Sequence, residues 1–218
     1  MDERREREAY ERTHEPARVM ALTDGVFAII LTLLVLEIHV PELASEKGLR
    51  QALEEIRPSF VAFTISFIVV AISWIGHREL FAHVRRTDRP LVWLNILYMF
   101  PLCLLPFGAS LLARYDTAAV ALQLYGFMLL AISLTRVWMF WYGTGHPHLL
   151  YESIDQRARV IGVAFVAVPA AVYLVAILIA DSSPTISLWI YALVPVVYLI
   201  GAFLGRRSLP PGWSGSEA

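Results

Sequence analysis

An apolar stretch between residues 17 and 38 carries Arg18 and Asp24 near its start and Thr32 in its middle. Arginine and aspartate can form hydrogen bonds or an ion pair, and a threonine hydroxyl can offer an oxygen to a cation. If the stretch spans a bilayer as a helix, only about a dozen residues, or roughly 18 Å, separate Asp24 from Glu37, whereas the hydrocarbon core is about 30 Å thick. One of these carboxylates then lies at membrane depth or in water that reaches inward. An ionisable group there predicts a functional site, and the plain alternative is that Asp24 caps or pairs within a helix bundle.

Polar side chains also interrupt the next two apolar stretches. Ser73, Trp74 and His77 share one helical face near the end of the second stretch, and Asn95 comes soon after the start of the third. These residues should lie at the depth of the two charges described above. Polar groups without partners are costly in a bilayer, so we predict a buried hydrogen-bond network. Its expected members are Arg18, Asp24, Trp74, His77 and Asn95, and the sequence leaves open which atoms pair.

A stripe runs along the first stretch at alternating steps of four and three residues. It comprises Arg18, Leu22, Gly25, Ile29, Thr32 and Leu36. Such a seam can face a neighbouring helix or a symmetry axis. Small and hydroxyl-bearing residues are also ordinary packing material between membrane helices, so packing and pore lining both stay open at this point. Because the helix is apolar nearly all round, periodicity does not choose the face.

The elements that position these residues are long uncharged segments. Of the 218 residues, 57% are hydrophobic and 17% are charged, whereas about a quarter of a typical soluble domain is charged. Each segment has about the 20 residues that a helix needs to cross a bilayer. Besides the first stretch, these segments are residues 58–76, 91–113, 117–135, 160–180 and 182–205, which makes six in all. We therefore predict an all-α polytopic membrane protein with six transmembrane helices in residues 18–207, preceded by a solvated arm or frayed helix over 1–17 and followed by a tail over 208–218.

The arginines predict the orientation of the chain. They cluster before the first span, between the second and third, between the fourth and fifth, and after the sixth. The positive-inside rule then places both termini in the cytoplasm. Arg136 falls near the inner end of the fourth span, where its side chain could reach the headgroups. In the loop after the first span, Leu49, Leu53 and Ile56 recur at helical spacing and predict a short amphipathic helix.

Several classes of function leave no trace in the sequence. The net charge of −1 gives no sign of nucleic-acid binding. There is no TVGYG filter, no ladder of arginines for voltage sensing, no nucleophile elbow and no phosphate-binding glycine loop. The one cysteine excludes an intrachain disulfide, and His146 with His148 in a loop is a weak metal signal. We expect neither enzymatic activity nor a metal or other cofactor.

The segment "RVMALTDGVFAIILTLLVLEI" resembles the first-helix signature of the transmembrane protein 175 family of potassium channels. That signature reads Arg, three variable residues, then Phe-Ser-Asp. Arg18 and Asp24 match it, whereas Leu22 and Thr23 depart from the Phe and the Ser, each by a related residue type. "SWIGHRELF" and "LNILYMFPLCLLPF" are similar to the second and third helices of the family. The six-span layout is similar to one bacterial repeat, so the resemblance covers nearly the whole chain.

The resemblance implies a homotetramer in which the first helix of each subunit lines a central pore. It implies that Ile29 forms the narrowest constriction, that Leu33 and Leu36 continue the lining, and that Thr32 is associated with cation preference. Potassium is the implied permeant ion, and some members of the family also pass protons. The implied role of Arg18 is in a polar network near the cytoplasmic end, which His77 and Asn95 are placed to join.

Three hypotheses follow for the function. The first is a potassium-permeable cation channel with a hydrophobic constriction in place of a carbonyl filter, in a bacterial plasma membrane. The alternative is a proton leak path or proton-coupled transporter that uses Asp24 and His77. The third is a membrane scaffold without transport. The lipid bilayer is a partner in all three.

Overall fold

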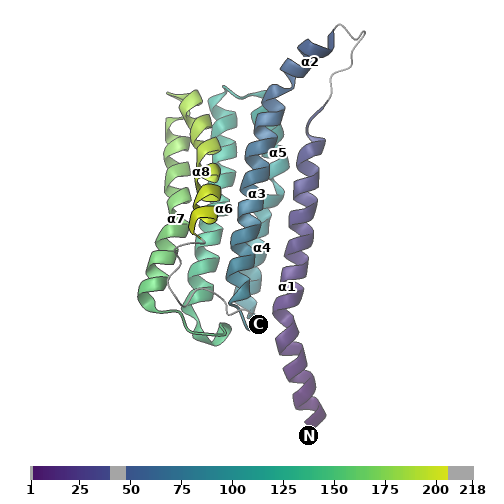
Figure 1. Cartoon of the computed structure of the whole chain (residues 1–218), viewed down its shortest axis with the longest axis vertical. Coiled ribbons are helices and arrows are strands. Elements are labelled where there is room, and N and C mark those ends of the chain that lie inside the picture. The colour runs from purple at the N-terminus through teal and green to yellow at the C-terminus, as the bar shows by residue number, and fades with distance from the viewer. Residues whose placement is uncertain (1, 40–47, 206–218) are drawn as a thin grey trace.

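The computed structural model describes residues 2–39 and 48–205, and only the backbone of residues 2–15, 52 and 202–205. Apart from one isolated bridge, the regular structure in these ranges is helical, which confirms the all-α prediction. The elements are α1 (Asp2–Leu36), α2 (Leu49–Glu55), α3 (Arg57–Ala82), α4 (Arg89–Cys103), α5 (Leu105–Arg114), α6 (Ala119–Gly145), α7 (Gln156–Ile179) and α8 (Pro184–Gly205) (Figure 1). The expected tail over residues 208–218 lies outside the described residues.

Within the described residues, six segments are long and apolar enough to cross a membrane, as the uncharged runs predict. They are Pro16–Leu36, Arg57–Ala82, Arg89–Arg114, Ala119–Gly145, Gln156–Ile179 and Pro184–Gly201. The protein is therefore a multi-pass membrane protein. The short helix expected after the first span is present as α2.

The charged N-terminal segment continues α1 as helix from Asp2 onwards, where we expected a solvated arm or a frayed helix. The segment is rich in glutamate and arginine, which are good helix formers, and it has no glycine. Pro16 lies inside the helix without ending it. Residues 2–17 and the first span are thus one element.

The third span is broken into two helices where two prolines lie close together. α4 ends at Cys103 and α5 begins at Leu105, with Pro101 and Pro106 on either side of Leu104. Proline lacks the amide hydrogen that would continue the helical ladder, so each proline weakens this turn. Pro169 and Pro195 also lie inside spans, yet α7 and α8 continue through them.

The helices pack side by side, and α1 stands along one edge of the bundle (Figure 1). Contacts join α1 to α3, α4 and α5, and α6 to α7 and α4. The face of α1 that meets its neighbours carries Phe27, Ile30 and Leu34, which are only 1%, 2% and 0% exposed. This face fixes the rotation of α1 about its own axis.

Two loops meet at the end of the bundle from which α1 starts. We call it the arginine-rich end, after Arg85, Arg86 and Arg157 in or beside these loops. The backbone N–H of Arg85 donates to the carbonyl of Leu149 at 2.7 Å, and the N–H of Tyr151 donates to the carbonyl of His83 at 3.1 Å. These bonds flank a bridge between Val84 and Leu150. The loop between α3 and α4 is therefore joined to the loop between α6 and α7.

Candidate functional site

The four-three stripe of α1 faces away from the rest of the subunit. Ile29 is 59% exposed and Leu36 is 66% exposed, and Leu22 and Leu33 are also exposed. A Cβ atom added to Gly25 would meet no atom within 4 Å. The opposite face holds the buried residues that pack on α3, α4 and α5. The structure thus decides which face of this apolar helix is free, a choice that periodicity left open.

Thr32 lies on the exposed face, one turn after Ile29. Its hydroxyl donates back along the helix, at 2.8 Å to the carbonyl of Ile29 and at 3.2 Å to that of Ala28. A hydroxyl oxygen that donates its hydrogen keeps lone pairs with which it can accept. In this geometry Thr32 presents an acceptor oxygen outward from the stripe.

A buried chain of hydrogen bonds joins α1, α3 and α4. The Asn95 side-chain N–H₂ donates to the Thr23 hydroxyl oxygen at 2.8 Å, and the Asn95 carbonyl oxygen pairs with Nε2 of His77 at 2.8 Å. Thr23 in turn donates to the carbonyl of Val19 at 2.8 Å. All three side chains are buried. Since each of these three side chains has a hydrogen-bond partner, the chain ties three helices together at one depth.

Asp24 and Trp74 form a second link between α1 and α3. The indole N–H of Trp74 donates to Oδ1 of Asp24 at 2.7 Å. The guanidinium carbon of Arg78 lies 5.8 Å from the centre of the Trp74 ring, within the range of a cation–π contact. Asp24 itself is exposed and lies beside the stripe. Asp24 therefore provides a carboxylate, fixed by the indole N–H of Trp74, at the edge of the free face of α1.

The structure brings together Asp24 with Trp74, and His77 with Asn95. Arg18 is exposed, and it makes no hydrogen bond or ion pair with any residue whose side chain is described; its membership of the network stays a prediction. Thr23 is a central member that the sequence reasoning named only as a departure from a family motif. A signal for it was available, because Thr23 is a hydroxyl residue at the depth of Asp24.

Aromatic rings close the network on its buried side. The His77 ring stacks on Phe81 with the ring centres 4.3 Å apart, and the Tyr98 hydroxyl donates to the carbonyl of Ser73 at 3.1 Å. Among the residues that the structure describes, no three His, Cys, Asp or Glu side chains are grouped as metal ligands would be. The arrangement is suited to holding α1 in place and to presenting its free face, and it offers no nucleophile beside a base.

Comparison with known proteins relates the chain to one group of membrane channels. The family model for the endosomal/lysosomal potassium channel TMEM175 matches residues 18–106, which hold α1 from Arg18 onwards, both links to α3, and the third span as far as Pro106. A protein of Streptomyces collinus described as a potassium channel is 38% identical over 149 residues, or 66% of this chain and 72% of that protein. A Danio rerio protein described as the endosomal/lysosomal proton channel TMEM175 is 26% identical over 150 residues, which cover 68% of this chain but 29% of that protein.

A solved structure has the same architecture. The crystal structure of a lysosomal potassium-selective channel TMEM175 homolog from Chamaesiphon minutus superposes with a TM-score of 0.76 at 29% sequence identity. The match covers 85% of this chain and 96% of that one. The arrangement of the six spans is therefore shared along nearly the whole of both chains.

Proposed function

This chain belongs to the TMEM175 family of membrane channels, and from that premise we propose that it is a potassium-permeable cation channel whose pore forms where the free faces of α1 from several subunits meet. The observation that carries the proposal is the exposure of the whole four-three stripe on a helix whose other face is packed. An apolar stripe with regularly placed small and hydroxyl residues suits a symmetry axis. A homotetramer, as the family resemblance implies, would place four such stripes around one path.

The constriction in this proposal is a ring of Ile29 side chains. Ile29 lies five residues after Asp24, or roughly 7.5 Å further along the helix axis. Branched aliphatic side chains hold water poorly, and an ion that enters their ring loses hydration without gaining ligands. Such a ring passes ions when it widens or becomes wet. Leu33 and Leu36 continue the apolar lining beyond it.

Thr32 is the proposed determinant of cation preference. Its hydroxyl hydrogen is used within the helix, so the oxygen that faces the path acts as an acceptor. Oxygen acceptors are the ligands that replace water around an alkali-metal ion. Four threonine oxygens one turn from the isoleucine ring would therefore receive a partly dehydrated cation as it passes the constriction.

The polar network is proposed to hold α1 at the angle that points the stripe at the axis. Asn95 and His77 anchor α1 through Thr23, while Trp74 anchors it through Asp24. We assign Arg18 to the same region, where it would act between subunits because it has no partner among the described side chains of its own subunit. The network would influence ion permeation through the orientation of α1, without direct contact with the ions.

The arginine-rich end is proposed to be cytoplasmic, which puts both termini on that side of a bacterial plasma membrane. Most of the arginines lie before the first span, between the second and third, between the fourth and fifth, and after the sixth, whereas the turn between α7 and α8 carries none.

A proton path is the second candidate, because several relatives are described as proton channels and the chain holds a buried histidine beside a held carboxylate. Asp24 and His77 would be the groups that carry the proton. The described hydrogen bonds join them to different partners, Trp74 and Asn95, which favours a structural role for both.

Ion flux from proteoliposomes tests the proposal. Full-length protein should release potassium down its gradient with a proton ionophore present, and the flux should be unchanged when the proton gradient is removed. A flux that needs the proton gradient would support the transporter instead. Absence of flux from a correctly sized oligomer would favour a scaffold without transport. Native mass spectrometry of the same preparation should give four subunits.

A further inference from the structure

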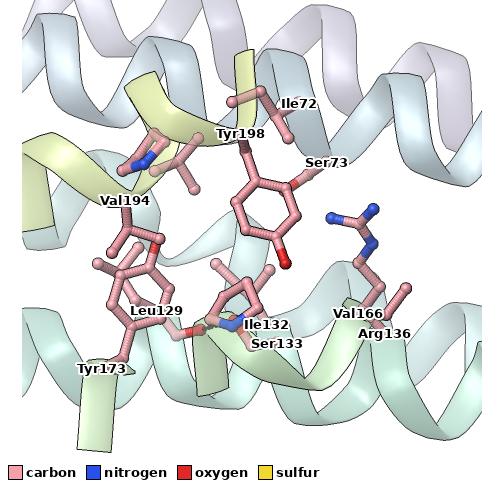
Figure 2. A pocket seen from close by; sticks show the side chains of 13 residues that line it. Ile72, Ser73, Leu129, Ile132, Ser133, Arg136, Val166, Tyr173, Val194 and Tyr198 are labelled. Carbon is pink, nitrogen blue, oxygen red and sulfur yellow. Dashed lines mark hydrogen bonds between the residues drawn. The ribbon is translucent and has the colours of Figure 1, made fainter. Parts of the chain in front are cut away.

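A partly open cavity of about 40 Å³ lies between the helices of the subunit, away from α1 (Figure 2). Its walls come from the middle turns of α3, α6, α7 and α8. Most of the lining is apolar, and the polar side chains that reach it are Ser73, Ser133, Arg136, Tyr173 and Tyr198. Because these segments lie well inside their spans, the cavity is at membrane depth and has no part in the stripe of α1.

Arg136 brings a positive charge to this cavity. Its guanidinium packs against Gly76 of α3, where even an added Cβ atom would collide with it. The side chain therefore lies between helices, whereas the sequence suggested that it could reach the headgroups. Arg136 is nine residues from the end of α6 at Gly145, or roughly 13 Å along the helix. A guanidinium does not lose its proton in proteins, so the charge persists at this depth.

The cavity has hydrogen-bond donors but no side chain of opposite charge. No carboxylate is among its lining residues, and Arg136 forms no ion pair with a described residue. Tyr173 is 5% exposed, and its hydroxyl has no hydrogen-bond partner among the described residues. Ser133 and Tyr198 already donate to the carbonyls of Leu129 and Phe165. What is left over is the partly exposed Arg136 guanidinium and the hydroxyl of the buried Tyr173, and each is a hydrogen-bond donor on the cavity wall.

We propose that this cavity binds a small monovalent anion, chloride in the cell, as the counter-ion of Arg136. A charge held between helices at membrane depth is costly unless it is paired, and the donors described above match an anion. One water needs about 10–15 Å³ of such volume, so the cavity has room for a halide with one or two waters. The anion would hold α3, α6, α7 and α8 together around Arg136.

Bromide in place of chloride tests the site directly. Crystals of the full-length protein grown in potassium bromide should show an anomalous scattering peak beside Arg136. Density there without a bromide signal would mean that the cavity holds water only and would overturn the proposal. This measurement uses the unmodified protein and does not depend on flux through the pore.

Thermal unfolding in detergent supplies the second test. At constant ionic strength, replacing gluconate by chloride should raise the unfolding temperature by about 5 °C once chloride exceeds its dissociation constant a hundredfold. Arg136→Gln should abolish this dependence, and the matched control Arg157→Gln, at an exposed arginine, should keep it. Equal chloride dependence in Arg136→Gln and the wild type would refute the site.

A third variant covers the case in which Arg136→Gln does not fold. Tyr173→Phe removes only the hydroxyl, so it should raise the half-saturating chloride concentration about tenfold, as the loss of one hydrogen bond to a charged group implies. An unchanged half-saturating concentration would remove Tyr173 from the site and, with no bromide peak, would leave the cavity without an anion.

Discussion

A comparison of the variants Ile29→Asn and Ile30→Asn distinguishes the face of α1 that lines the pore from the face that packs within the subunit. The two residues are neighbours in sequence, about 100° apart around α1, and their surroundings differ sharply: Ile29 is 59% exposed, whereas Ile30 is 2% exposed. The same substitution therefore tests two faces of the same turn. We expect Ile29→Asn to raise basal potassium flux and Ile30→Asn to destabilise the subunit.

The magnitudes follow from these surroundings. At position 29 the new amide meets no buried neighbour within the subunit, so the fold should lose less than about 1 kcal/mol. A ring of amide oxygens would give the ion ligands worth about 1.5–3 kcal/mol, which corresponds to roughly a 10- to 100-fold rise in flux. At position 30 the loss of apolar burial and an unpaired amide should cost roughly 3–6 kcal/mol.

The assay is potassium efflux from liposomes at matched protein content, with sodium and potassium reversal potentials measured on the same preparation. Ile29→Asn should also lose discrimination against sodium, because a wet constriction admits hydrated ions. Ile30→Asn should show a lower unfolding temperature or a lower yield of oligomer. If Ile29→Asn has wild-type flux and Ile30→Asn is the leaky variant, the pore uses a different face and the stripe is a packing surface.

Three further substitutions test other parts of the proposal. Thr32→Val keeps the shape and removes the outward oxygen, so discrimination between potassium and sodium should fall about tenfold while the oligomer stays intact; reversal potentials under biionic conditions measure this, and unchanged values would exclude Thr32. Asn95→Leu leaves Nε2 of His77 without its partner and removes one of the two hydrogen bonds of Thr23, so it should lower the free energy of unfolding by roughly 2–4 kcal/mol, with chemical denaturation in detergent as the readout. Arg18→Ala should reduce the fraction of assembled oligomer more than it changes selectivity, and normal oligomer size and thermal stability on native gels would count against a role for Arg18 between subunits.

The number of spans was predictable because it rests on the length and charge of segments. Each uncharged run is long enough to cross a bilayer, and no tertiary contact alters that count. The division of the third span at Leu104 was only partly predictable. Pro101, Pro106, Pro169 and Pro195 all lie in the interior of spans. Only at the close pair Pro101 and Pro106 is a helix interrupted, whereas α7 continues through Pro169.

The free face of α1 was not predictable from periodicity alone. Val, Ile and Leu occur on all its sides, so a hydrophobic pattern cannot distinguish Ile29 from Ile30. The contacts of Phe27 and Leu34 with other helices make the distinction, and those depend on the whole bundle. For the same reason the sequence placed His77 and Asn95 at one depth but could not show that Thr23 completes their hydrogen bonds.

The paired loops at the arginine-rich end have a consequence for biosynthesis. Val84 lies directly after the second span, but its partner Leu150 is made only after the fourth span has been translated. At ordinary rates of synthesis several seconds pass between the two. During that interval α3 and α4 are in the membrane without the backbone bonds that tie their connecting loop. The order in which the ribosome delivers the spans therefore leaves this hairpin incomplete until α6 has been inserted.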